Sequence, residues 1–244
     1  DERVSWPRMG EATTRTWRDP DVVLVLDRAW RAEVTGPRWI AGAAPGPAEW
    51  ALPADAFEAG GRDELGPEAR ALVLARLGPR LGDLVWDVGA GSGALAVECA
   101  RLGAAVVAIE RDPAACARLR RNVLAHRVKV MLTCGRAPAA LEPLPDPDAV
   151  FVGGGGVEVI AACAARRPRV LVAAVAAGDA GDAEGAVPPV LHALREHGYT
   201  AEGTLLRARP LVPADGERGD EARRTAPDAA ETALVWGRLP EPPG

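Results

Sequence analysis

The sequence predicts an α/β fold in which a mostly parallel β-sheet is covered by helices on both faces and a last strand is antiparallel. From about residue 66 onward, short apolar runs alternate with segments of helical periodicity, as in consecutive β–α units. A glycine-rich stretch, Gly89–Gly93, follows the first of these runs. The last two runs have no helical segment between them, so one of them is expected to be antiparallel.

Five helices are expected from apolar periodicity and from residues typical of helix ends. The first is followed by Gly78-Pro79, which cannot continue it. Pro113 lies where the third helix begins, since proline is tolerated in a first turn, and Gly198 is placed to end the last helix. In chain order the predicted helices are Glu68–Leu77, Gly93–Leu102, Pro113–His126, Val157–Arg166 and Val187–His197.

Strands are expected at the apolar runs between these helices. Runs of four to eight residues rich in Val, Ile, Leu and Ala are typical of strands buried on both faces. In chain order they are Leu84–Val88, Ala105–Ile109, Val128–Thr133, Ala149–Val152, Arg169–Val175, Thr200–Arg207 and Thr232–Gly237, which makes seven strands. Between the last two lies Ala214–Ala230, rich in Asp, Glu and Arg, which we expect to be mobile or lid-like.

The first fifty residues differ from the rest of the chain. They hold five of the seven tryptophans and one strand candidate, Val22–Leu26, followed by proline- and glycine-rich connections. A single strand is not stable by itself, so this one must pair with another part of the protein. We therefore expect two units, residues 1–50 and residues 51–244.

Composition and charge argue against several classes of protein. The 244 residues carry a formal net charge of −5, whereas nucleic-acid binders need a basic surface. No apolar run approaches the length of a membrane span, and residues 1–30 lack the plan of a signal peptide. The four cysteines are expected to be buried free thiols in a reducing cytoplasm, with neither a metal nor a disulfide: Cys99, Cys116, Cys134 and Cys163.

A ligand site is predicted at Asp87–Gly93, where three glycines let the backbone turn tightly before a helix N-terminus. Asp87 precedes the first glycine by two positions, where its carboxylate can meet a cationic ligand group but would repel a pyrophosphate. Glu110 ends the second strand, where it can accept hydrogen bonds from both ribose hydroxyls. Asp87 therefore favours S-adenosylmethionine, whereas Glu110 indicates an adenosine ligand without choosing between S-adenosylmethionine and NAD. The alternatives are the NAD site of an oxidoreductase, because glycine spacing alone does not exclude it, and a turn without a ligand.

A second candidate site lies at Gly153–Gly156, four glycines that follow the fourth strand. Open α/β sheets bind ligands at the carboxyl ends of their strands, and glycines leave the backbone open to a flat or bulky ligand. The Asn/Asp-Pro-Pro-aromatic sequence of DNA and RNA amino-methyltransferases is absent at this place. We interpret the run as part of a substrate site, with a flexible loop as the alternative.

Five stretches together carry a resemblance to a known family. They are Leu52-Pro53-Ala54-Asp55-Ala56-Phe57, Pro67-Glu68-Ala69-Arg70, Asp87–Gly93, Gly135-Arg136-Ala137-Pro138-Ala139-Ala140-Leu141 and Phe151–Gly156. In this order they resemble the C-terminal half of the precorrin-6Y C(5,15)-methyltransferases (decarboxylating) of cobalamin biosynthesis, over residues 52–212. The resemblance implies the Rossmann-like, seven-stranded fold of class I S-adenosylmethionine-dependent methyltransferases. It also implies that residues 1–50 are the tail of a preceding carbon-5 methyltransferase domain.

The activity that the resemblance implies is methylation at carbon 15 of a precorrin tetrapyrrole with loss of CO2 from the ring C acetate. It assigns no catalytic residue, and it implies a homo-oligomer. The expected cofactor site comprises Leu65, Asp87, Gly89, Ala90, Gly91, Ser92, Gly93, Glu110 and Ala137. The expected substrate contacts are Gly154, Gly155, Gly156, Arg207 and Arg209, the arginines pairing with substrate carboxylates.

The chain departs from the family pattern at two places. Leu65 and Gly66 stand where the family usually has a threonine and a lysine, which removes a hydroxyl and a positive charge. Residues 172–179 lack the usual Asn or Thr with a following Glu. These departures motivate a third hypothesis, a non-catalytic methyltransferase-like subunit.

Overall fold

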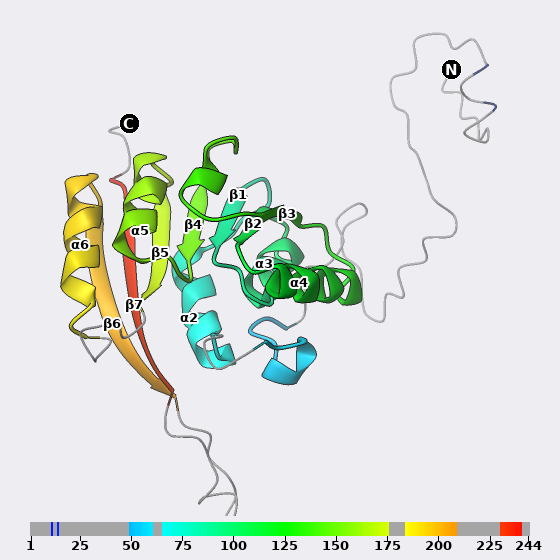
Figure 1. The fold of residues 1–244 in the computed structure, drawn as a ribbon, viewed down its shortest axis with the longest axis horizontal. Coiled ribbons are helices and arrows are strands. Elements are labelled where there is room, and N and C mark those ends of the chain that lie inside the picture. Colours follow the sequence, from blue (N-terminus) through cyan, green and yellow to red (C-terminus); the bar gives the residue numbers. More distant parts are fainter. Residues whose placement is uncertain are drawn as a thin grey trace, which may run out of the picture. The chain divides into compact units, whose positions relative to one another are not determined.

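The structure is a computed structural model, and it describes residues 11, 14, 49–60, 65–175, 184–208 and 230–240 (Figure 1). Contacts along the chain separate two units, residues 1–44 and 45–244, and only Glu11 and Thr14 of the first unit are described. The predicted strand Val22–Leu26, residues 214–229 of the predicted mobile segment, and Arg209 therefore lie outside the described residues. The account that follows concerns the second unit.

The second unit contains a seven-stranded sheet in the order β3-β2-β1-β4-β5-β7-β6. The first five strands in the chain pair in parallel, whereas β7 pairs antiparallel with both β5 and β6. The strands are β1 (Leu84–Val88), β2 (Ala105–Glu110), β3 (Met131–Cys134), β4 (Ala149–Val152), β5 (Val170–Val175), β6 (Thr200–Ala208) and β7 (Ala230–Arg238). The predicted fold class, with its antiparallel last strand, is confirmed.

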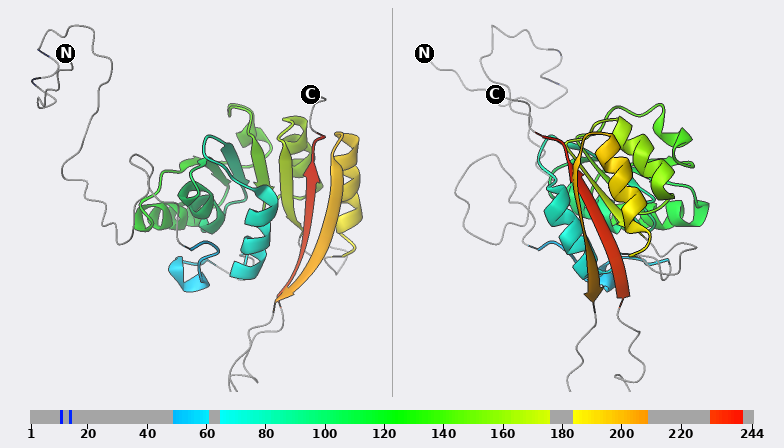
Figure 2. Two further views of the ribbon diagram at one scale, coloured as in Figure 1. Left: turned by 180° about the vertical axis from the view of Figure 1, so that it is seen from behind. Right: turned by 90° about the vertical axis from the view of Figure 1, so that its left-hand side faces the viewer.

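Helices cover both faces of this sheet (Figure 2). One face carries α2 (Pro67–Leu77), α3 (Ala94–Arg101) and α4 (Pro113–Ala125), and the other carries α5 (Gly156–Ala165) and α6 (Val187–Glu196). Side chains alternate between the faces along each strand, so Val85 packs with the first group of helices and Trp86 with the second. Both residues are fully buried, as a sheet covered on two sides requires. Among the described residues, no helix has the length and apolar character needed to cross a membrane.

The edge strand β3 is shorter than predicted because the turn that follows α4 takes up the beginning of the expected strand. Arg127 has a left-handed backbone (φ 53°), and the N–H of Val128 donates to the carbonyl of Val123 in α4. Val128 is therefore held in the turn after the helix, and pairing with β2 begins only at Met131. The prediction that all four cysteines are buried is wrong for Cys134, which is exposed because it ends this edge strand. All four are free thiols.

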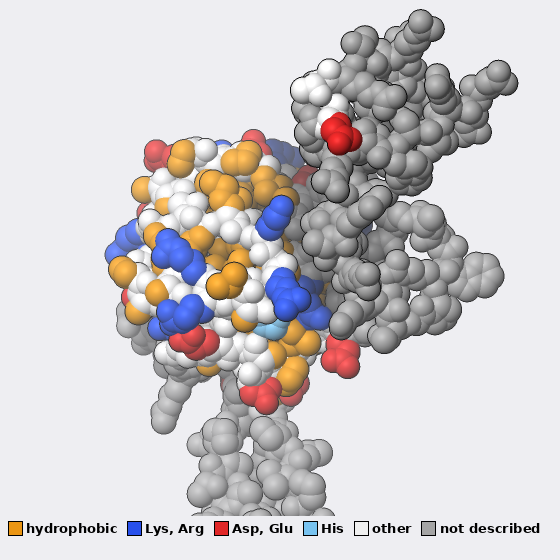
Figure 3. Space-filling model, turned by 90° about the vertical axis from the view of Figure 1, so that its right-hand side faces the viewer, with side chains coloured by type: hydrophobic (Ala, Val, Ile, Leu, Met, Phe, Trp, Pro, Cys, Tyr) orange, Lys and Arg blue, Asp and Glu red, His pale blue; other side chains and the backbone are white. Residues whose placement is uncertain are grey.

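The side of the molecule near α4 and β3 mixes basic side chains with apolar ones (Figure 3). Two large apolar side chains of these elements are open to solvent, Leu124 at 78% and Met131 at 58% exposure. Single exposed apolar residues are normal on protein surfaces, so they do not by themselves indicate an interface. The oligomeric state stays a prediction.

A buried ion pair holds the segment around the short 3₁₀-helix η1 (Ala54–Ala56) against α2 and α3. Arg70 and Glu98 are only 2% and 1% exposed, and Nε of Arg70 lies 2.5 Å from Oε1 of Glu98. Arg70 also donates to the carbonyls of Leu52 and Leu65. Glu98 accepts from the N–H groups of Ala51 and Leu52. Because both ions are buried and paired with this segment, the network fixes where the chain enters the domain.

Candidate functional site

A cavity of about 590 Å³ opens at the carboxyl ends of the central strands. It lies where the strand order reverses, since the chain runs outward from β1 through β2 to β3 and then returns to β4 on the other side of β1. Open α/β sheets bind ligands at such a switch point. The loops after the strands form most of the lining: Val88, Gly89 and Gly91; Ile109–Asp112; Gly135–Ala139; and Gly153–Gly155.

The loop after β1 needs its glycines for two different reasons. Gly91 has a φ of +56°, and a Cβ there would meet nothing within 4 Å, so only its backbone conformation demands glycine. Gly89 has a φ of +77°, and a Cβ there would lie 3.0 Å from the backbone nitrogen of Gly154. The two predicted glycine sites, Gly89–Gly93 and Gly153–Gly156, thus meet backbone to backbone. This contact leaves one continuous glycine-lined wall across β1 and β4.

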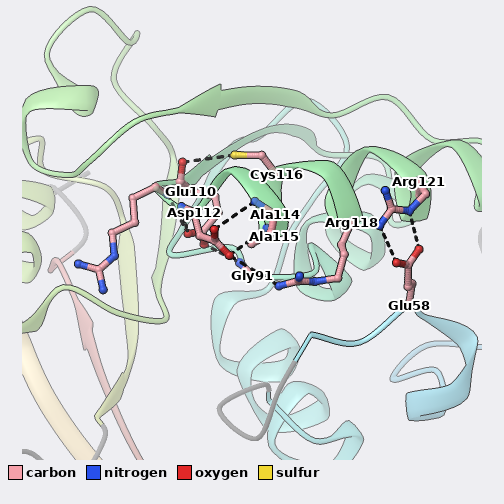
Figure 4. A network of polar contacts seen from close by, with 10 residues as sticks. Glu58, Gly91, Glu110, Asp112, Ala114, Ala115, Cys116, Arg118 and Arg121 are labelled. Carbon is pink, nitrogen blue, oxygen red and sulfur yellow. Dashed lines mark hydrogen bonds and ion pairs between the residues drawn. The ribbon is translucent and has the colours of Figure 1, made fainter.

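Glu110 organises the neighbouring loop while keeping part of its carboxylate available. Its Oε2 accepts from the N–H of Gly91 at 2.9 Å, and its Oε1 accepts from the N–H groups of Arg111 and Asp112, both at 2.8 Å (Figure 4). A carboxylate can accept about four hydrogen bonds. One acceptor position on Oε2 therefore stays free in a residue that lines the cavity and is 8% exposed. This is what a ribose-binding acid needs.

Asp87 is in a different position from the one its sequence context suggests. It does not line the cavity, it is 1% exposed, and neither carboxylate oxygen has a hydrogen-bond partner among the described residues. Burial raises its pKa from 3.8 to about 7, and the negative charge of Glu110 adds to this rise. The amide of Ala96 in the first turn of α3 lowers the pKa, although it does not reach standard hydrogen-bond geometry with either oxygen. Asp87 is thus a buried carboxyl group beside the glycine loop, and no hydrogen bond from the described residues offsets the cost of burying it.

Asn122 of α4 joins the glycine loop to the segment that enters the domain. Its amide donates to the carbonyls of Ser92 (2.9 Å) and Glu58 (3.2 Å) and accepts from the N–H of Glu58 (2.9 Å). Arg121 holds the Glu58 carboxylate through two 2.6 Å hydrogen bonds (Figure 4). Two residues further on, Gly60 lines the cavity and packs against the guanidinium of Arg118, with which any Cβ at this position would clash.

The structure brings some of the predicted site residues to the cavity and leaves others away from it. Gly89, Gly91, Glu110, Ala137, Gly154 and Gly155 line it. Six more do not line it: Leu65, Asp87, Ala90, Ser92, Gly93 and Gly156. Asp87 belongs to strand β1, and Gly156 begins α5. Arg207 lies on β6, where its guanidinium pairs with Glu231 of β7 at 2.7 Å, so this cation is engaged away from the cavity.

Sequence reasoning missed several charged residues that line the cavity, namely Arg111, Asp112, Arg118, Arg136 and Glu158. Asp112 caps α4, because its carboxylate accepts from the N–H groups of Ala114 and Ala115. Its Oδ2 lies 4.0 Å from the guanidinium of Arg118, whose Nε is buried without a partner among the described residues. The signal for Arg111 and Arg136 was their place just after strand ends, at the edge where such sheets bind ligands. Glu158 lies further on, in the first turn of the helix that follows β4.

Comparison with known proteins decides the family. A family model described as a precorrin methyltransferase domain matches residues 55–187, just over half of the chain. The chain belongs to the precorrin methyltransferase domain family. The match includes the loops after β1, β2, β3 and β4, so the whole strand-end part of the cavity lies inside it.

Three similar proteins show how much of a longer relative this chain corresponds to. A Sinorhizobium sp protein named precorrin-6Y C(5,15)-methyltransferase [decarboxylating] is 46% identical over 94 residues, 37% of this chain and 23% of the relative. A Pyrobaculum calidifontis protein named "Probable cobalt-precorrin-6B C(15)-methyltransferase (decarboxylating)" is 39% identical over 97 residues, 38% of this chain and 50% of the relative. The chain thus spans no more than half the length of these two curated relatives.

The third relative is a solved structure, the C-terminal domain of precorrin-6Y C5,15-methyltransferase from Rhodobacter capsulatus. It is 28% identical to this chain with a TM-score of 0.59, and the similarity covers 78% of this chain and 97% of that domain. The fold described above is therefore that of a methyltransferase domain of this family, as the resemblance predicted.

Proposed function

We propose that this chain transfers a methyl group from S-adenosylmethionine to carbon 15 of a precorrin tetrapyrrole, with loss of CO2 from the ring C acetate. Membership in the precorrin methyltransferase domain family supports the substrate class. The observation that supports an adenosine-containing cofactor is the free acceptor position of Glu110 beside the glycine loop, inside a cavity of about 590 Å³. That volume is within the range of small-molecule sites.

The residues present fit this cofactor. Glu110 would accept from a ribose hydroxyl with Oε2, while Gly135–Ala137 and Arg111 would lie on either side of the adenine as the loops after β3 and β2. Gly89 and Gly91, which both line the cavity, would face the methionine part. When bound, S-adenosylmethionine supplies a sulfonium methyl group that an electron-rich carbon can attack directly.

The work left to the chain is orientation of the two ligands and exclusion of water. The glycine-lined wall across β1 and β4 lets both ligands approach the backbone closely. Holding an acceptor carbon in line with a methyl group can supply a large part of the rate enhancement. This agrees with the small number of groups capable of acid–base chemistry in the lining.

The oxidoreductase alternative is not favoured. The common dinucleotide-binding sheet is parallel in the order 3-2-1-4-5-6, whereas here the antiparallel β7 lies between β5 and β6. Asp87 also places a carboxyl group below the loop that would receive a pyrophosphate. The non-catalytic alternative rests on Leu65 and Gly66, and Leu65 does not line the cavity and uses its carbonyl to hold Arg70.

Two measurements test the proposal. Calorimetric titration with S-adenosylhomocysteine and with NADH separates the cofactors, and we expect binding of the first only. Incubation with S-adenosylmethionine and precorrin-6Y, followed by mass spectrometry, should show gain of one methyl group and loss of one CO2. Tight NADH binding would reverse the cofactor assignment, and cofactor binding without turnover would favour the non-catalytic subunit.

We also propose a domain organisation, a cellular location and an assembly state for the protein. Residues 1–50 would be the tail of a preceding carbon-5 methyltransferase domain, supported by the larger size of the Sinorhizobium relative and by the separation of residues 1–44 as a unit. A cytoplasmic location and a homo-oligomer complete the proposal. Mass measurement of the native assembly tests the last point.

Replacing Glu110 should weaken cofactor binding. Glu110→Ala removes the acceptor for ribose and releases the amides of Gly91, Arg111 and Asp112. Hydrogen bonds to charged groups contribute about 1.5–3 kcal/mol, so the Kd for S-adenosylhomocysteine should rise by roughly ten- to a hundredfold. Glu68→Ala, an exposed acid in the first turn of α2, is the control. An unchanged Kd for Glu110→Ala would remove this residue from the site.

A further inference from the structure

The lining of the cavity contains few groups that can deliver a proton. Glu110 and Asp112 use their carboxylates on backbone amides, three for Glu110 and two for Asp112. The three arginines of the lining offer guanidinium groups that bind anions and donate hydrogen bonds: Arg111, Arg118 and Arg136. Among the described lining residues, Glu158 is the remaining ionisable side chain, and no hydrogen bond or ion pair engages its carboxylate.

The position of Glu158 places it at the reacting end of the cavity. The loops follow the strand order, from Gly135–Ala139 after β3, through Glu110 after β2 and Gly89 after β1, to Gly153–Gly155 after β4. If the adenosine binds at the β2–β3 side with its ribose on Glu110, the methionine part would lie toward β1 and β4. Glu158 lies in the first turn of α5, directly after the β4 glycines, and its side chain is exposed. The methyl acceptor would then bind beside it.

Loss of CO2 creates a need for a proton at this end. When the bond between the side-chain methylene and its carboxylate breaks, the electron pair stays on the methylene carbon and its conjugated ring system, and CO2 leaves. That carbon then has to receive a proton to become a methyl group. A carboxyl group that a bulky ligand shields from water is favoured in its neutral, proton-carrying form.

We propose that Glu158 is the catalytic residue that delivers this proton, an inference that rests on the proposed function. The O–H bond of Glu158 breaks, a C–H bond forms on the former acetate methylene, and the carboxylate regains its proton from solvent. The arginines that line the cavity on the β2–β3 side, by contrast, would serve to bind ligands. Glu158 therefore carries the acid–base part of the decarboxylating reaction, and methyl transfer requires no further protein acid.

The test compares Glu158→Gln with wild type and with the control Glu68→Gln, which changes an exposed acid in the first turn of α2. The substrates are precorrin-6Y and S-adenosylmethionine, and CO2 release and product mass are followed. For Glu158→Gln we expect kcat to fall by at least about a hundredfold, with unchanged KM and unchanged Kd for S-adenosylhomocysteine. Glu158→Asp should recover part of kcat, which a merely structural role would not produce.

The outcomes separate this inference from the proposed function. If Glu158→Gln turns over at the wild-type rate, Glu158 is not the proton donor, although the methyltransferase assignment stands. A rise in KM with unchanged kcat would make it a binding residue and also overturn the inference. If wild-type protein binds S-adenosylhomocysteine but does not convert precorrin-6Y, the proposed function fails, and the role of Glu158 fails with it.

Discussion

An Asp87→Asn variant is expected to gain stability relative to wild type as the pH rises from about 4 to about 8. The pKa of Asp87 is raised from 3.8 to about 7 in the folded protein, because burial disfavours its charged form. The folded state therefore holds a proton that the unfolded chain has lost, and wild-type stability falls as the pH rises through this window. At 1.36 kcal/mol per pKa unit, the full difference is on the order of 4 kcal/mol. Asparagine has nearly the same shape and does not titrate.

Urea unfolding of both proteins across this pH range measures the effect. The quantity to follow is the free energy of unfolding of the variant minus that of wild type, measured at each pH. Its change with pH reports the titration of Asp87, because the buried amide of asparagine adds a destabilising cost that does not depend on pH. A difference that stays constant from pH 4 to pH 8 would show that Asp87 does not titrate in this window. Asp146→Asn is a suitable control, because Asp146 is an exposed acid paired with Arg166.

The same substitution should affect cofactor binding in the opposite direction. A sulfonium and an ammonium group above the glycine loop would favour the ionised carboxylate of Asp87, so wild-type protein should release a proton on binding near neutral pH. Calorimetry with S-adenosylmethionine in buffers of different ionisation enthalpy detects this proton. The variant should bind more weakly and without proton release. A role of Asp87 in attracting the cationic cofactor would explain why a carboxyl group that destabilises the fold is kept in the core.

The strand ends next to the glycines were the most predictable part of the fold. β1 and β4 have the bounds predicted from sequence, because each is a short apolar run that stops at a glycine. The start of β3 was predicted three residues too early and its end one residue too early, since the left-handed conformation of Arg127 leaves no sequence pattern. Helix periodicity and proline positions set the helices to within about two residues of their observed ends.

The candidate site was predictable where a residue type alone carries the chemistry. Glu110 could be proposed because an acid at the end of the second strand has one common role in such sheets. Its bonds to three backbone amides, and the burial of Asp87 outside the lining, depend on how the loops pack. Asn122 and Gly60 could not be proposed at all. Their importance comes from contacts with residues 30 and more positions away, which periodicity does not encode.

Removing one partner of the buried pair between α2 and α3 should have a large effect on stability. Glu98→Ala leaves the Arg70 guanidinium buried with only two carbonyl oxygens, those of Leu52 and Leu65. Breaking a buried ion pair in this way costs about 3–5 kcal/mol. The N–H groups of Ala51 and Leu52 lose their acceptor as well. We therefore expect the variant to be strongly destabilised in urea unfolding and to lose hydrogen-exchange protection at residues 51–57.

The double variant Arg70→Met/Glu98→Met separates the charge from the packing. Removing both ions relieves the buried unpaired charge, so stability should recover in part, while the backbone groups of the entering segment stay unpaired. The segment leads to Gly60 in the cavity wall, so cofactor affinity should fall in both variants even where stability recovers. Equal stability of Glu98→Ala and the Asp146→Asn control would contradict a role for the pair in holding the fold. Recovery of stability together with wild-type affinity would show that the entering segment does not shape the site.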